Sequence, residues 1–218
     1  MAPIPTTKSS NMNHKLLPCL LAATLAAAAL PAAAQSAGEW TVGIGVHNVD
    51  PKSNNGTLAN GTLPLSIGSS ARPSATFEYF IRDNLGVEVL AAWPFEHDIS
   101  VKGLGKVGST KHLPPTVSLQ YHFNDKGRVS PLIGAGVNFT TFFDSKTTGP
   151  LAGSDLSLSS SWGLGVHAGL DFRISERATL RVDARWMNIE SSVRVDGQRL
   201  GTAKIDPLVY GAAYVMKF

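Results

Sequence analysis

Residues 162–174 read WGLGVHAGLDFRI, and this stretch decides the fold class of the chain. Every second residue is apolar without a break, and the residues between them are small, polar or charged. Because successive side chains of a β-strand point to opposite faces, such a strand has one apolar and one polar face. The apolar face carries Trp162, Leu164, Val166, Ala168, Leu170, Phe172 and Ile174, and the polar face carries Gly163, Gly165, His167, Gly169, Asp171 and Arg173.

The same alternation recurs in seven other segments. They are residues 40–49, 74–81, 85–93, 115–123, 129–143, 180–186 and 208–218. No charged residue falls on any of the apolar faces. Consecutive alternating strands joined by turns predict an all-β protein, an eight-stranded antiparallel up-and-down β-barrel.

Two kinds of barrel share this pattern. A soluble lipocalin-like barrel turns its apolar face inward, whereas an outer-membrane barrel turns that face to lipid. Glycine alternating with charged residues suits a narrow interior, and large unbroken apolar faces suit an exterior with unlimited room. Aromatic residues also gather near both ends of the apolar faces. From Trp162 to Phe172 a tilted strand spans about 25 Å, the height of an outer-membrane apolar band. The sequence therefore predicts a transmembrane barrel.

The connections between the segments alternate in length. Three are short (residues 82–84, 124–128 and 175–177) and four are long (residues 50–73, 94–114, 144–161 and 188–207). Membrane barrels keep short turns in the periplasm and long loops outside the cell. We therefore expect long polar loops, with strand-like extensions beyond the membrane, at the outer end.

The beginning of the chain has the features of an export signal. Residues 16–34 form a long apolar stretch, preceded by Lys8 and Lys15 and ending in three alanines before Gln35. We expect a cleaved signal peptide at residues 1–34 and the outer-membrane barrel at residues 35–218. A true membrane helix is the alternative, disfavoured because the stretch is mostly alanine between Pro18 and Pro31. The single cysteine, Cys19, excludes a disulfide framework.

Charged residues on the polar faces are expected to meet inside the barrel. The interior of an eight-stranded barrel is just filled by side chains, so these charges would plug the lower lumen. The predicted plug consists of Glu78, Glu88, Asp171, Arg173, Arg181, Asp183 and Arg185. His122 and His167 lie on the same inner faces and are expected to join it.

An apolar solute entering from the outer mouth would then have to leave sideways through the wall. Leu90, Pro114, Pro115 and Phe142 are the candidates for lining this path. Because prolines 114 and 115 cannot donate ladder hydrogen bonds, they mark either a strand start or a local opening in the wall.

Other chemistry finds little support in the sequence. No serine and histidine pair at strand spacing, so we expect no enzyme and no cofactor. The histidines lack zinc spacing, although His97 and His112 flank a long connection where a surface metal stays an open alternative. The chain has no basic run interleaved with aromatic residues, so we expect no nucleic-acid partner.

Five stretches resemble the OmpW family of eight-stranded outer-membrane barrels, whose relatives include the alkane-uptake protein AlkL. They are residues 83–99 (DNLGVEVLAAWPFEHDI), 112–116 (HLPPT), 131–144 (PLIGAGVNFTTFFD), 155–163 (DLSLSSSWG) and the terminal Phe218. The end of the chain, with Tyr214, Met216 and Phe218 on one face, also resembles the signal read by the barrel-assembly machinery.

The family resemblance implies a location and a role. It implies a barrel in the outer membrane of a Gram-negative bacterium, in contact with membrane lipid and lipopolysaccharide. It further implies that small hydrophobic molecules pass the outer leaflet and are released laterally into the bilayer. The alternative that the resemblance leaves open is a structural or adhesive surface protein, or a phage or colicin receptor acting through its extracellular loops.

Overall fold

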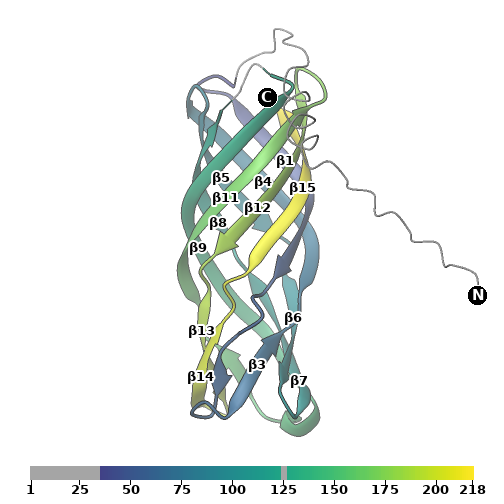
Figure 1. Ribbon diagram of the computed structural model, residues 1–218, viewed down its shortest axis with the longest axis vertical. Coiled ribbons are helices and arrows are strands. Elements are labelled where there is room, and N and C mark those ends of the chain that lie inside the picture. Colours follow the sequence, from purple (N-terminus) through teal and green to yellow (C-terminus); the bar gives the residue numbers. More distant parts are fainter. Residues whose placement is uncertain (1–34, 124–126) are drawn as a thin grey trace, which may run out of the picture.

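The computed structural model describes residues 35–123 and 127–218, so the predicted signal peptide lies outside the described residues. Eight antiparallel strands form a closed cylinder in the order β1-β4-β5-β8-β9-β11-β12-β15, and β15 pairs back with β1 (Figure 1). The prediction of an eight-stranded antiparallel barrel is confirmed. The barrel strands are β1 (Trp40–Asp50), β4 (Ser70–Arg82), β5 (Leu85–Ala92), β8 (Thr116–His122), β9 (Val129–Thr147), β11 (Ser161–Arg173), β12 (Ala178–Met187) and β15 (Leu208–Lys217).

The two ends of the barrel differ. The short connections β4–β5, β8–β9 and β11–β12 lie at the end that also holds the C-terminus, here called the turn end (Figure 1). The opposite end, here called the arm end, carries the long connections. Pairing of β1 with β15 runs from Thr41 opposite Lys217 to Asp50 opposite Leu208, which leaves the barrel no free edge.

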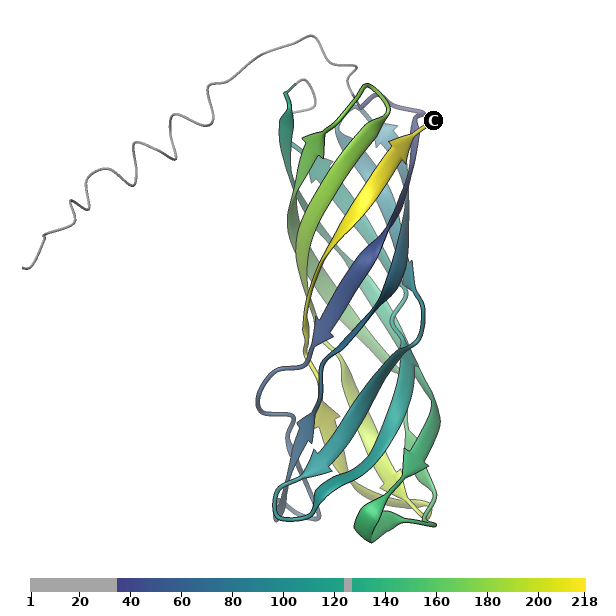
Figure 2. The ribbon, with the colours of Figure 1, turned by 90° about the vertical axis from the view of Figure 1, so that its right-hand side faces the viewer.

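The long connections are more ordered than polar loops. They contain seven further strands that continue the cylinder beyond the barrel (Figure 2). These strands are β2 (Thr57–Leu58), β3 (Leu63–Ile67), β6 (Phe95–Val101), β7 (Gly105–Leu113), β10 (Leu156–Leu158), β13 (Glu190–Val195) and β14 (Gln198–Lys204), and a 3-10 helix η1 (Gly149–Leu151) follows β9. Among the described residues, no helix is long and apolar enough to cross a bilayer.

An apolar core explains why the arms fold. The inward-facing residues of the arms pack into a buried cluster, here called the arm core: Leu58, Leu65, Ile99, Val101, Val107, Leu156, Val193 and Ala203. Alternation within the membrane-length segments does not predict this core, because its residues are distributed over four separate connections. Burying them against one another gives the arms their own hydrophobic stabilisation.

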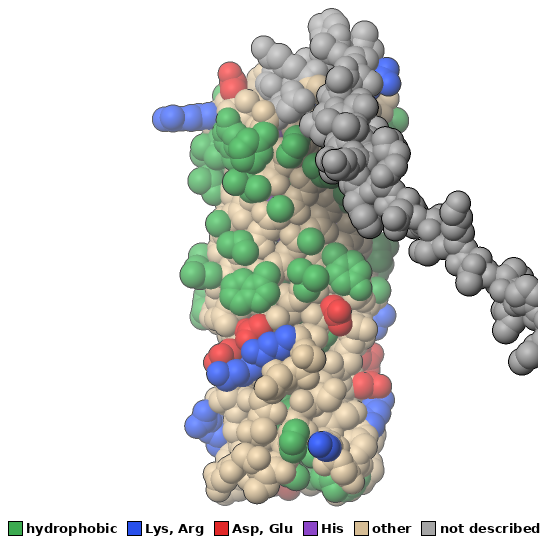
Figure 3. Space-filling view, in the orientation of Figure 1, with side chains coloured by type: hydrophobic (Ala, Val, Ile, Leu, Met, Phe, Trp, Pro, Cys, Tyr) green, Lys and Arg blue, Asp and Glu red, His purple; other side chains and the backbone are tan. Residues whose placement is uncertain are grey.

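The apolar faces of the barrel strands point outward, as predicted. Trp162 is 72% exposed and Leu164 is 67% exposed, whereas His167 and Asp171 on the other face of β11 are buried. Hydrophobic side chains form two belts on the surface, and charged side chains lie between the lower belt and the arm end (Figure 3). Aromatic rings pack within these belts, with centroids 4.6 Å apart for Phe139 and Trp162. Two aromatic girdles around an apolar band are typical of a transmembrane barrel.

Exchanging Val166 for arginine tests this orientation. Val166 is half exposed near the middle of the outer face of β11. Val166→Arg is expected to lower the free energy of unfolding by about 2–4 kcal/mol, because a charge near the bilayer midplane loses its hydration. Urea unfolding in lipid vesicles measures the effect. Ile174→Arg, one residue past β11 on the same face, is the depth control and is expected to cost about 0–1 kcal/mol. Equal losses in the two variants would contradict the assigned membrane position.

Candidate functional site

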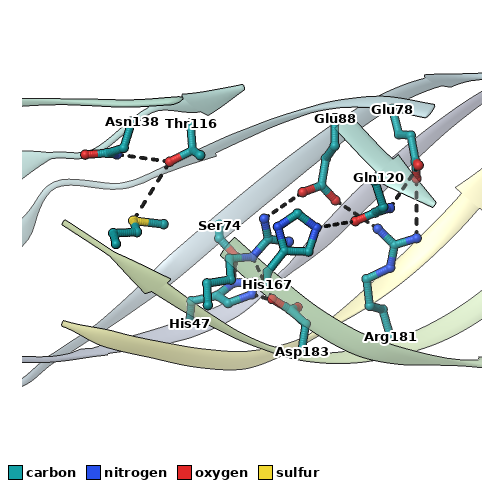
Figure 4. A network of polar contacts seen from close by, with 12 residues as sticks. His47, Ser74, Glu78, Glu88, Thr116, Gln120, Asn138, His167, Arg181 and Asp183 are labelled. Atoms are coloured by element: carbon teal, nitrogen blue, oxygen red, sulfur yellow. Dashed lines mark hydrogen bonds and ion pairs between the residues drawn. The ribbon is translucent and has the colours of Figure 1, made fainter. Parts of the chain in front are cut away.

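Arg181 holds the centre of the barrel interior. It extends from β12 and reaches carboxylates on three other strands, of which Glu78 and Glu88 are drawn in Figure 4. Its Nε donates to Asp171 Oδ1 over 2.7 Å, and its Nη1 donates to Glu88 Oε2 over 2.9 Å. A longer contact of 3.4 Å joins Nη2 to Glu78 Oε2. Glu78 and Glu88 are directly opposite each other on β4 and β5, so their like charges would repel without this guanidinium between them.

A second cation completes the link across the lumen. Arg185, four residues farther along the same face of β12, donates from Nη1 to Glu88 Oε1 over 2.7 Å and from Nε to Asp183 Oδ2 over 2.6 Å. His47 on β1 donates to the other oxygen of Asp183, and its second ring nitrogen lies 2.6 Å from Ser74 Oγ. The network therefore ties β1, β4, β5 and β12 together inside the barrel.

Gln120 and two histidines fill the rest of the network. Gln120 donates from Nε2 to Glu78 Oε1 over 2.8 Å, and His122 donates from Nε2 to the same oxygen over 2.9 Å. His167 donates to Gln120 Oε1 over 2.8 Å. His122 and His167 were expected on the inner face, whereas Gln120 and His47 were not singled out as plug residues. Their alternation with glycine and serine on polar faces was the signal that could have identified them.

Six of the seven predicted plug residues meet in this network, here called the polar plug. Its members are His47, Glu78, Glu88, Gln120, His122, His167, Asp171, Arg181, Asp183 and Arg185, all of them buried. Arg173 has a different place. It is half-buried at the turn end, where it lines a small polar pocket with Arg177 and Lys217. Its position near the end of β11 brings it out of the centre of the lumen.

Removing Arg181 tests how much the plug contributes to stability. Arg181→Met leaves three buried carboxylates without their shared cation, and we expect a loss of about 3–5 kcal/mol in the free energy of unfolding. Urea titration followed by tryptophan fluorescence measures it. Arg128→Gln, an exposed arginine at the turn end, is the control and should change little. A loss no larger than that of the control would show that the plug residues do not depend on Arg181.

An apolar chamber lies on the arm side of the polar plug. Its buried residues, here called the chamber cluster, are Val49, Leu90, Phe95, Met187, Ile189, Ile205 and Val209, with Ala92 and Phe142 half-buried against them. The cluster surrounds a cavity of about 10 Å³, room for one water molecule. The lining of this cavity includes Leu90 and Pro114 together with the plug residue His47 and its hydrogen-bond partner Ser74. The lumen thus changes from ionic to apolar within a short distance.

The barrel wall beside this cavity is interrupted. Pairing of β5 with β8 ends at Leu90 and Thr116, and pairing of β6 with β7 begins at Phe95 and His112. Between these points, residues 91–94 are not paired with residues 113–115. We call this gap the seam. Three prolines at positions 94, 114 and 115 lie in it, and proline has no N–H to donate. The two sides of the seam are therefore not paired with each other, although Trp93 still donates to the Pro73 carbonyl and Phe139 to the Pro115 carbonyl.

The four residues predicted for the solute path lie around the seam. Leu90 and Pro114 are buried and line the cavity, and Phe142 packs half-buried on the chamber cluster. Pro115 is exposed on the outside of the wall. The structure thus brings these residues together from β5, β9 and the stretch before β8.

His97 and His112 differ from the surface site that the sequence left open. Their side chains are buried in the lumen, and their rings stack with centroids 4.8 Å apart. Within the described residues, no group of three or more metal-ligating side chains is placed to hold an ion. Burial lowers the pKa of His112 well below its usual range, and the neighbouring His97 acts in the same direction. Burial also lowers the pKa of His97, partly opposed by its bond to the Gly68 carbonyl.

These two imidazoles predict that the arms lose stability in acid. Below the unfolded-state pKa of about 6.5, the unfolded chain binds protons that the folded chain excludes, so stability falls as the pH decreases. The loss is at most about 1.4 kcal/mol per pH unit for each imidazole. Hydrogen exchange of the β6 and β7 amides at pH 7.5 and 5.5 measures it. The doubly substituted His97→Phe/His112→Phe chain should show no such change, and equal protection of the unsubstituted chain at both pH values would contradict the prediction.

Comparison with known proteins identifies the family to which this barrel belongs. The model of the OmpW family matches residues 36–218. The chain belongs to the OmpW family. Outer membrane protein W of Vibrio cholerae is 36% identical over 92% of this chain and 98% of its own length. The crystal structure of the outer membrane protein OprG from Pseudomonas aeruginosa superposes with a TM-score of 0.76 at 31% identity, over 85% of this chain and 98% of that one.

Outer membrane protein AlkL of Ectopseudomonas oleovorans is a more distant relative, 28% identical over 82% of each chain. As an OmpW-family barrel this protein resides in the outer membrane, where short turns face the periplasm and long arms face outward. The polar plug then lies in the periplasmic half of the lumen, and the chamber cluster and the seam lie toward the outer leaflet. Tyr214 and Met216 are exposed on β15, and Phe218 is exposed one residue past its end; the assembly signal predicted at these residues stays a prediction.

Proposed function

We propose that this OmpW-family barrel carries small hydrophobic molecules past the outer leaflet and releases them sideways through the seam into the bilayer. The observation that carries the proposal is the position of the apolar cavity. It lies between the polar plug and the outer mouth, directly beside the unpaired stretch of the wall. The same role is what resemblance to the family implies.

Passage of a hydrophobic solute through the polar plug toward the periplasm is energetically unfavourable. Passing it would require separating Arg181 and Arg185 from carboxylates that are buried with them. Breaking such a buried pair costs about 3–5 kcal/mol, and an apolar solute has no charged or polar group that could replace the lost partner. A solute that moves from the chamber into the hydrocarbon of the bilayer only changes from one apolar environment to another. The sideways exit is therefore the lower barrier.

The seam allows the chamber to open. A cavity of about 10 Å³ is too small for any solute larger than water, so the chamber cluster must move apart during passage. Elsewhere in the barrel such a movement would break ladder hydrogen bonds. At residues 91–94 and 113–115 it breaks none between the two sides of the seam, and half-buried Phe142 and Ala92 border the space that must widen.

Filling the cavity tests the proposed path. Leu90→Trp places a large ring in the chamber and is expected to reduce uptake of octane to the level of cells that lack the protein. Val89→Trp is the matched control, because Val89 immediately precedes Leu90 on β5 and its exposed side chain points outward to lipid. Folding of both variants is checked by gel mobility before and after heating. Unchanged uptake in a correctly folded Leu90→Trp barrel would overturn the path.

The family also leaves a receptor or adhesive role open, and the arm tips offer a surface for it. Arg194 and Arg199 are exposed on β13 and β14, away from the arm core. Replacing both by serine keeps the arm core intact. Lost adhesion or phage binding with unchanged octane uptake would assign the tips a receptor role, and unchanged adhesion would argue against it. Neither role requires a covalent step, in keeping with relatives that are named as outer membrane proteins.

A further inference from the structure

A polar pair interrupts the apolar lining of the outer lumen. The inward-facing row of β6 reads Phe95, His97, Ile99 and Val101, so His97 is the one polar member of an apolar row. His112 reaches it from β7, and the two rings stack with an interplanar angle of 18°. His97 is 2% exposed and His112 is 1% exposed. We call these two side chains the imidazole pair.

The pair lies on the way from the outer mouth to the seam. On β6, Phe95 belongs to the chamber cluster on one side of His97, and Ile99 belongs to the arm core on the other. The His112 ring contacts Phe95 and Phe142, with centroids 5.6 and 5.7 Å away. A solute that enters through the arms and reaches the cavity must therefore pass the imidazole pair.

Both rings carry a buried nitrogen without a hydrogen bond. The Nε2 atoms of His97 and His112 have no partner among the described residues. The Nδ1 atom of His97 contacts the carbonyl oxygen of Gly68, which can only accept, so Nδ1 carries the proton. In a neutral His97 ring, Nε2 is then a buried acceptor without a hydrogen bond to any described residue. Among the plug histidines, His47 has both ring nitrogens bonded, and the unbonded Nδ1 of His122 lies 3.5 Å from the carboxylate of Asp171, whereas no acidic side chain in the described part of the chain is paired with His97 or His112.

Unsatisfied buried nitrogens are rare in folded proteins and call for an explanation. The His97 ring stacks on Phe95, and Phe142 packs against the neighbouring His112 ring. A hydrogen-bond acceptor in these surroundings fits a ligand that is apolar apart from one hydrogen-bond donor. A plain alkane leaves the acceptor unsatisfied. A carboxylate is acceptor-only and would lose its hydration without gaining a cation. An uncharged alcohol supplies the missing donor and keeps its hydrocarbon part against the aromatic rings.

We propose that the imidazole pair is a binding station that selects apolar molecules bearing a hydroxyl group over plain hydrocarbons of the same length. This inference rests on the proposed function, since it assigns a preference to the same passage. The hydroxyl donates to Nε2 of His97, and His112 offers a second nitrogen beside it.

Competing uptake of two solutes tests the station. The measured quantity is the ratio of protein-dependent 1-octanol uptake to octane uptake. His97→Phe and His112→Phe keep an aromatic ring and remove the nitrogens, and we expect the ratio to fall about fivefold in His97→Phe, the range of one net hydrogen bond. Thr110→Val is the matched control, because its buried hydroxyl is already bonded to Ser145 Oγ over 2.9 Å. Its ratio should stay unchanged.

A second measurement uses the unsubstituted chain and so does not depend on how the variants fold. Histidine ¹⁵N spectra of the protein in lipid nanodiscs report hydrogen bonding at each ring nitrogen. We expect 1-octanol to shift the Nε2 resonance of His97 in the direction of a hydrogen-bonded nitrogen, and octane to leave it unshifted.

The outcomes separate the inference from the function on which it rests. If the unsubstituted chain carries neither solute, the proposed function fails. If it carries both, yet the uptake ratio of His97→Phe equals that of Thr110→Val and the Nε2 resonance ignores 1-octanol, the passage stands and the imidazole pair is not its station.

Discussion

The Arg181 guanidinium lies among three carboxylates, and the rest of the barrel interior is arranged around it. Asp171, Glu78 and Glu88 come from three different strands and would repel one another without a shared cation. Such charges are tolerable inside a membrane protein only when they are paired, because water is scarce in a filled lumen. The pairing fixes which strands face one another across the barrel and closes its periplasmic half.

Above the plug the lumen has the opposite chemistry. The chamber cluster and the arm core present apolar side chains from strands that lie far apart in the sequence. This division gives the molecule an apolar interior on the arm side and an ionic interior on the turn side. The proposed sideways route depends on the seam. Its three prolines have no N–H with which to pair the two sides of the seam.

The long connections fold into ordered arms. They were expected as polar loops with some strand-like extension, but they form hairpins with a shared buried core. Their interior is packed with apolar side chains, and the imidazole pair lies there between Phe95 and Ile99 of β6. A hydroxyl-selective station would follow from this arrangement, since it combines an apolar lining with one unsatisfied acceptor.

The sequence by itself determined the strands, their faces and their order, because a period of two over ten residues reports directly which side chains share a face. It also identified most plug charges, since a charge on the polar face of a membrane strand can point only to the lumen. Only the tertiary structure decided which of those charges meet, that Arg173 lies at the periplasmic end, and that His97 and His112 are buried together. Those facts depend on register and on contacts between distant segments, which alternation within a single strand does not encode.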